Sequence, residues 1–107
     1  MKHQSIQHLS NSTDKAIALW LEPYGEAFTF EPGASFKIVA EGEQPGELEV
    51  VRDKADVITV YTWSGSTCAV YQNDQLLRDY PFPVPPVPEG LSTRRFVEKL
   101  FRGKESK

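Results

Sequence analysis

The side chains that most often carry out catalysis or bind metals are few in this chain of 107 residues. His3 and His8 are its two histidines, and Cys68 is its single cysteine. On a β-strand an offset of five residues places two side chains on opposite faces, so the two histidines do not make a ready metal site. Cys68 shares an alternation phase with Val70, which predicts a buried thiol that behaves as a small apolar group.

Acidic and glycosylation motifs are equally weak as signs of chemistry. Four carboxylates bracket one turn: Glu41, Glu43, Glu47 and Glu49. Carboxylate oxygens are ligands that Ca²⁺ prefers, but these four lack the dense acidic loop of calcium sites. A solvated hairpin tip is therefore the favoured interpretation. Asn11-Ser12-Thr13 matches the glycosylation sequon, yet a polar turn is the simpler interpretation. We therefore predict no metal, no cofactor and no catalytic residue, and an enzyme is the least favoured class.

The elements that would position these residues are short β-strands. Apolar and polar residues alternate along residues 4–80, and short turns separate the segments. Connections this short exclude the crossovers of a dozen or more residues that parallel strands need. Pro32-Gly33 and Pro45-Gly46 indicate type II turns, in which the glycine takes a positive φ. We expect an all-β fold, an antiparallel β-sandwich or small barrel of about eight short strands, with a short C-terminal α-helix after a proline-rich linker.

The alternation phase opposite the core carries large aromatic side chains, which is unusual for a solvent-facing surface. A three-residue loop at Ser64-Gly65-Ser66 would pair Trp63 with Thr67 and bring the aromatic residues to one face. If their strands are neighbours, four residues form a candidate binding surface: Trp20, Tyr61, Trp63 and Tyr71. Such a surface suits a protein partner, or a planar or sugar ligand that stacks on the rings.

The chain changes character after Tyr80, and we divide it into three parts. Residues 1–80 form the β domain, residues 81–90 form a proline-rich linker or wrap, and residues 91–107 form a short basic amphipathic helix and tail. Ser92 is the expected N-cap of the helix. The predicted docking face of the helix consists of Phe96, Val97, Leu100 and Phe101. Because a helix of about ten residues is marginal in water, it must dock on its own chain, on a second copy or on another protein.

Charge is distributed unevenly along the chain. Residues 1–90 hold six basic and thirteen acidic side chains, whereas residues 91–107 hold six basic and two acidic ones. The acidic body argues against nucleic-acid binding, and no apolar run is long enough to span a membrane. A single cysteine and no apolar leader segment make the cytoplasm the expected location. The sequence thus predicts a non-catalytic protein-interaction or assembly module, with self-association or a protein partner through the helix; the alternative is a small-ligand or carbohydrate-binding β domain.

Overall fold

The computed structural model describes residues 2–86 and 91–105, which form eight strands followed by one helix. The predicted all-β class, the number of strands and the C-terminal helix are confirmed. The elements are β1 (His3–Ser10), β2 (Ile17–Glu22), β3 (Glu26–Phe30), β4 (Ser35–Gly42), β5 (Glu49–Lys54), β6 (Val57–Tyr61), β7 (Ser66–Gln72), β8 (Gln75–Tyr80) and α1 (Thr93–Glu105).

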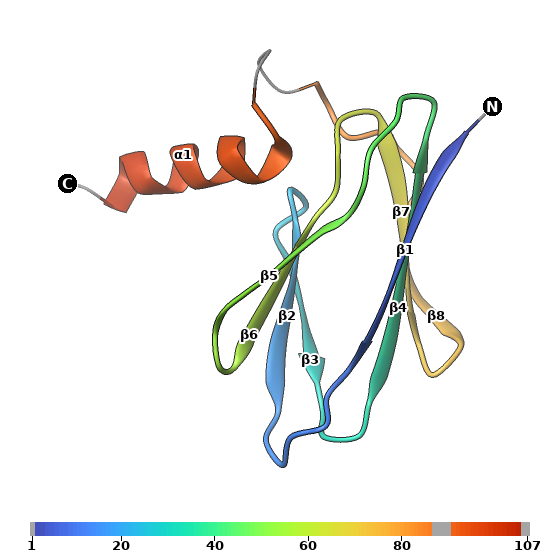
Figure 1. Cartoon of the computed structure of the whole chain (residues 1–107), viewed down its shortest axis with the longest axis vertical. Helices are drawn as coiled ribbons and strands as arrows, with labels where there is room; N and C mark the ends of the chain where they lie inside the picture. Colours follow the sequence, from blue (N-terminus) through green and yellow to red (C-terminus); the bar gives the residue numbers. More distant parts are fainter. Residues whose placement is uncertain (1, 87–90, 106–107) are drawn as a thin grey trace.

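The strands form two four-stranded sheets that face each other, as Figure 1 shows. The first sheet has the order β1-β4-β7-β8 and the second has the order β3-β2-β6-β5. Inward-facing residues of both sheets share one apolar core because every second side chain of a strand points to the same face. Its fully buried large members are Leu19, Leu21, Phe30, Phe36, Ile38, Val60 and Val70.

One pair of neighbouring strands departs from the antiparallel expectation. β2 and β6 run parallel, with Leu19 opposite Ile58 and Leu21 opposite Val60. The expectation considered only direct connections between consecutive strands. Here the chain leaves the second sheet after β3, builds β4 in the first sheet and returns through β5. Parallel partners can therefore meet without a helical crossover.

The predicted hairpin between β6 and β7 is wrong, because these two strands belong to different sheets. Thr67 pairs with Glu41 of β4 rather than with Trp63. Glu43 and Glu47 likewise lie on a connection between sheets, since β4 and β5 do not pair, and not at a hairpin tip. The alternation of apolar residues fixes which face a residue occupies, but it does not show when the chain changes sheets.

The proline-rich segment is hydrogen-bonded to the β domain through Val84. The Val84 N–H donates to the Ser66 carbonyl at 2.9 Å, and the Gly65 N–H donates to the Val84 carbonyl at 2.8 Å. Val84 is buried, whereas the neighbouring Phe82 is 80% exposed. We call residues 81–86 the proline strap.

The helix α1 begins near the end of the second sheet, and its C-terminal end extends past the body of the molecule (Figure 1). Ser92 caps it as predicted, because its Oγ accepts a hydrogen bond from the Arg95 N–H at 3.1 Å. Among the described residues, no helix is both long enough and apolar enough to cross a membrane.

Candidate functional site

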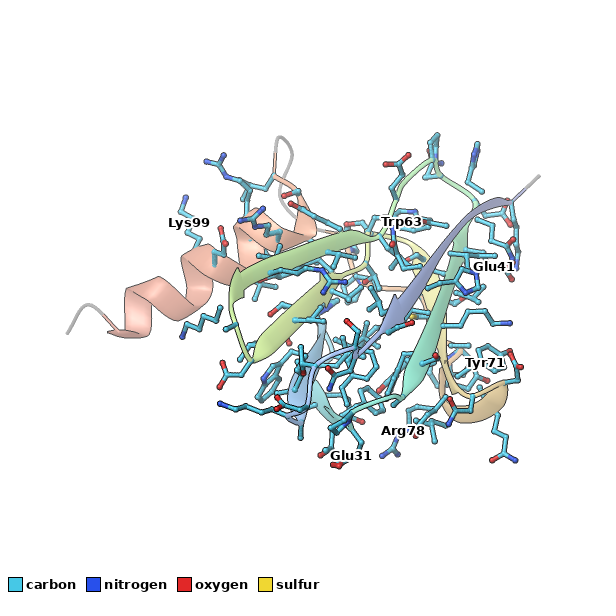
Figure 2. The ribbon with its side chains drawn as sticks, turned by 60° about the horizontal axis from the view of Figure 1, so that its bottom comes forward. Glu31, Glu41, Trp63, Tyr71, Arg78 and Lys99 are labelled. Atoms are coloured by element: carbon cyan, nitrogen blue, oxygen red, sulfur yellow. The ribbon has the colours of Figure 1, made fainter. Side chains whose placement is uncertain are left out.

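The four aromatic residues of the predicted binding surface occupy three different environments. Trp20 and Tyr61 both lie on the outer face of the second sheet. They lie near each other because their strands, β2 and β6, are neighbours. Trp63 follows β6 on a connection between sheets. Tyr71 lies on β7 in the first sheet, and Figure 2 shows it on the opposite side of the molecule from Lys99 of α1. The structure thus brings together two of the four residues.

Trp63 packs against the core and holds the connection between β4 and β5. Its indole Nε1 donates to the Gln44 carbonyl at 3.2 Å. A Cβ atom added to Gly46 would overlap the Trp63 ring, so the glycine is needed for close approach. Gly46 is not among the described glycines with positive φ, which corrects the type II turn predicted there, whereas Gly33 has a φ of 81° as expected. Trp63 is therefore placed to stabilise a loop.

Tyr71 is half-buried on the outer face of the first sheet. It pairs with Lys37 of β4, and the Lys37 ammonium lies 4.7 Å from the centre of its ring. A cation over an aromatic face is attractive and also hides that face from other contacts. The ring thus has a cationic partner on its own sheet.

Tyr61 is only 8% exposed, although it lies on an outer face. Strand register places it in a row across the second sheet, with Glu49 of β5 on one side and Glu22 of β2 on the other. Glu22 is also buried, and this burial raises the pKa of its carboxyl group, while the Gly25 N–H donates to the carboxylate and lowers it in part. Something must cover this row.

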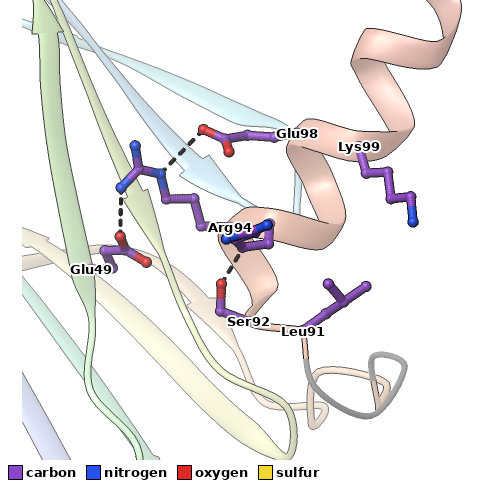
Figure 3. A pocket seen from close by; sticks show the side chains of 7 residues that line it. Glu49, Leu91, Ser92, Arg94, Glu98 and Lys99 are labelled. Carbon is purple, nitrogen blue, oxygen red and sulfur yellow. Dashed lines mark hydrogen bonds and ion pairs between the residues drawn. The ribbon is translucent and has the colours of Figure 1, made fainter.

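The first part of α1 lies beside this row. Arg94 donates to Glu49 Oε2 at 2.7 Å and to Glu98 Oε2 at 3.2 Å, so it joins the helix to β5, as Figure 3 shows. Val97 is 7% exposed and α1 contacts β2. Two residues of the predicted docking face, Phe96 and Val97, are at least partly buried. The side chains of the other two, Leu100 and Phe101, lie outside the described part of the structure.

The rest of this outer face is open, and we call it the Trp20 face. Trp20 is 40% exposed, and its partners across the sheet are Ala27 on β3 and Thr59 on β6. The next row holds Ala18, Thr29 and Val57, which border a shallow depression of about 360 Å³. A large exposed ring among small side chains is typical of a contact surface, since the small residues let a partner approach the ring.

The residues with catalytic or metal-binding potential do not assemble into a site. Cys68 is buried, and burial is the main cause that raises the pKa of its thiol to about 12. His3 and His8 are exposed at opposite ends of β1. Within residues 2–86 and 91–105, no three histidine, cysteine or acidic side chains are grouped so that they could hold a metal ion.

Asn11 has a structural role that the sequon does not suggest. It is 1% exposed, and its Nδ2 donates to the Lys15 and Phe30 carbonyls, each at 2.7 Å. Its Oδ1 accepts hydrogen bonds from Thr13. The amide nitrogen that glycosylation would modify is thus fully engaged, and the interpretation of this motif as a polar turn is confirmed.

A second concavity, which the sequence analysis did not single out, lies where the proline strap meets α1. Tyr24, Tyr80, Phe82, Thr93 and Phe96 line it together with prolines and Val84, and its volume is about 490 Å³. The Tyr24 and Tyr80 rings stack with their centroids 4.2 Å apart. Tyr80-Pro81 and Phe82-Pro83, which follow the end of β8, contribute two of its rings. We call this concavity the tyrosine groove.

Comparison with known proteins adds no further constraint: no family model, curated protein or solved structure matches this chain.

Proposed function

We propose that this protein is a non-catalytic interaction module that docks a partner protein on the Trp20 face. The observation that carries this proposal is the 40% exposure of Trp20 between small side chains on a sheet whose inner face is fully packed. Tryptophan combines a large apolar area with a polar edge, and it is enriched among the residues that dominate protein interfaces.

The helix α1 supplies the second part of the proposed surface. Its first turns lie at the end of the same sheet, and its C-terminal end extends beyond the body (Figure 1). Arg95 and Lys99 are exposed on it. A basic helix beside an apolar face suits a partner with apolar side chains surrounded by carboxylates. A second copy of this chain fits that description, since residues 1–90 hold thirteen acidic and six basic side chains.

We also propose a cytoplasmic location. The free thiol of Cys68 is buried, which is compatible with a reducing compartment.

The proposal is tested by Trp20→Ser in the full chain, with Leu77→Ser as the matched control. Leu77 is 44% exposed on β8 of the other sheet, so both changes replace an exposed apolar side chain by serine. Circular dichroism checks the fold, and sedimentation over a wide concentration range measures self-association. We expect Trp20→Ser to abolish association and Leu77→Ser to keep it.

A partner other than a second copy is tested by affinity capture with the same two variants. The expected result is a protein captured by the wild type and by Leu77→Ser but not by Trp20→Ser. If the wild type and Trp20→Ser have the same solution mass at every concentration and capture the same proteins, the proposal is wrong.

A further inference from the structure

The two sheets have four edge strands, and three of them carry features that oppose further strand pairing. The edges are β1 and β8 in the first sheet and β3 and β5 in the second. The register of β5 and of β8 with the neighbouring strand is interrupted. Arg78 of β8 lies opposite the buried Val70, which puts its charge on the inner side, 3.9 Å from Glu26 of β3. Bulges and inward-pointing charges are devices by which proteins prevent pairing at sheet edges.

The fourth edge strand, β1, has none of these features. All of its residues, from His3 to Ser10, pair with β4 without a register shift. Its sequence contains no proline, lysine, arginine, aspartate or glutamate. Among the described residues β4 is its one strand neighbour, so about half of its backbone N–H and C=O groups point to a free edge. An edge of this kind is ready to accept another strand.

The side chains of β1 indicate what an added strand carries on its outer side. Ile6 is 43% exposed on the outer face and lies opposite Val39 of β4, which in turn lies opposite Ala69 of β7. These three residues form an apolar row that ends at the free edge. Since directly opposite side chains make the main contacts between neighbouring strands, an aliphatic residue beside Ile6 would continue the row and cover its exposed part.

Acidic side chains mark one end of this edge. Glu43 follows the residue that lies opposite His3. The same connection returns to β1 at Leu48, whose N–H donates to the Ser5 Oγ at 3.0 Å, and it carries Glu47. Both carboxylates are exposed. If two copies of this chain paired through β1, both acidic connections would lie at the interface and repel each other. A single strand with a basic residue at this end meets the opposite charge instead.

We propose that β1 binds an extended segment of another protein as an additional antiparallel strand of the first sheet. The segment is uncharged along most of β1 and has an aliphatic residue opposite Ile6. It has a basic residue at its C-terminal end, which antiparallel pairing places beside His3. Backbone hydrogen bonds supply most of the affinity, and the residues beside Ile6 and Glu43 supply the selectivity. This inference does not depend on the Trp20 face, because β1 and Trp20 belong to different sheets.

The test titrates the synthetic peptide acetyl-Thr-Thr-Thr-Val-Thr-Thr-Lys-amide into the full ¹⁵N-labelled chain and follows the amide signals by NMR. We expect saturable shifts in residues 3–10 and slower hydrogen exchange at alternate amides of β1, because only those amides point to the added strand. No saturable shift, or shifts confined to another surface, overturns the proposal.

Two control peptides test the assigned contacts. In one the central valine is replaced by proline, and in the other the lysine is replaced by glutamate. We expect no binding of the first, since proline cannot donate to a strand ladder, and about tenfold weaker binding of the second. Equal affinity of the proline peptide would show that binding does not use strand pairing. Equal affinity of the glutamate peptide would contradict the role of the acidic end.

Matched variants locate the binding edge on the protein. Ile6→Lys places a charge in the middle of β1, whereas Leu76→Lys makes the same change on β8, the other edge of this sheet, where Leu76 is 55% exposed. We expect Ile6→Lys to bind the peptide about tenfold more weakly and Leu76→Lys to bind it as tightly as the wild type. Equal affinity of both variants contradicts the assignment to β1.

Sedimentation without peptide tests for the other occupant. If Ile6→Lys has a lower solution mass than the wild type and Leu76→Lys does not, a second copy occupies this edge and the proposal is overturned. We expect the three proteins to have the same mass. Because the comparison of the three peptides needs no variant, the proposal remains falsifiable if Ile6→Lys fails to fold.

Discussion

The outer faces of the two sheets carry similar residues but differ in what covers them. On the first sheet, Tyr71 lies beneath the Lys37 ammonium of the neighbouring strand. On the second sheet, Tyr61 is buried beside Glu49, which binds Arg94 of α1, whereas Trp20 on the same sheet is open between small side chains. The comparison shows that an aromatic residue on an outer face is not itself a sign of binding. The side chains around it and the element above it determine whether the ring is available.

The largest expected effect separates the two tyrosines. Tyr61→Ala should lower the free energy of unfolding by about 3–5 kcal/mol, as for a buried aromatic side chain. Tyr71→Ala should lower it by about 1 kcal/mol or less because that ring is only half-buried. Chemical denaturation of both variants measures the difference. Similar losses for the two would mean that the burial of Tyr61 contributes little to stability.

A smaller effect concerns the pH dependence of the same buried row. Since the pKa of Glu22 is raised above its usual 4.5 in the folded state, folding favours the protonated carboxyl. This contribution is fully present below the unfolded pKa and is lost as pH rises through the folded pKa. Glu22→Gln, which stays neutral and can still accept from the Gly25 N–H, should therefore gain stability relative to the wild type as pH rises.

Denaturation curves between about pH 3.5 and pH 7.5 measure this difference. The same substitution at the exposed Glu31 is the control for general removal of a negative charge. A difference between Glu22→Gln and the wild type that stays constant or shrinks with rising pH would show that burial of the Glu22 carboxylate carries no cost.

The smallest expected effect comes from uncovering the aromatic ring on the outer face of the first sheet, so that it resembles Trp20 on the second. Lys37→Ala removes the cation above Tyr71 and should cost about 0.5–1 kcal/mol of stability. It should also leave the Tyr71 ring more exposed, which tyrosine-selective chemical modification can measure. Unchanged modification of Tyr71 in this variant would show that Lys37 does not shield the ring.

Much of the fold follows from local sequence patterns, and the exceptions have physical causes. The alternation that predicts strands also accounts for the burial of Ile38, Val60 and Val70, because strand periodicity depends only on neighbouring residues. The parallel partnership of β2 and β6 could not be deduced, since it depends on which sheet each strand joins. The Ser64-Gly65-Ser66 loop has residue types that are typical of a hairpin turn, yet it connects strands of two different sheets.

The candidate sites were harder to predict for the same reason. Trp20 and Tyr61 were correctly assigned to the face opposite the core, but local spacing gave no sign that only Tyr61 would be buried there. The glycine at position 46 could not be explained from local sequence either. It is needed because the Trp63 ring leaves no room for a Cβ atom, and not because its turn requires a positive φ. The tyrosine groove joins Tyr24, Tyr80 and Thr93, which are far apart in the sequence, and no local pattern brings such residues together.

The attachment of the proline strap at Val84 also limits how far α1 can move from the β domain. Only eight residues separate Val84 from Thr93, the first residue of the helix. A tether this short gives the helix an effective concentration near its docking site that is about millimolar. If α1 separated from Glu49, it would therefore rebind faster than a helix that is free in solution. The strap thus favours the contact between Arg94 and Glu49 without adding any bond to it.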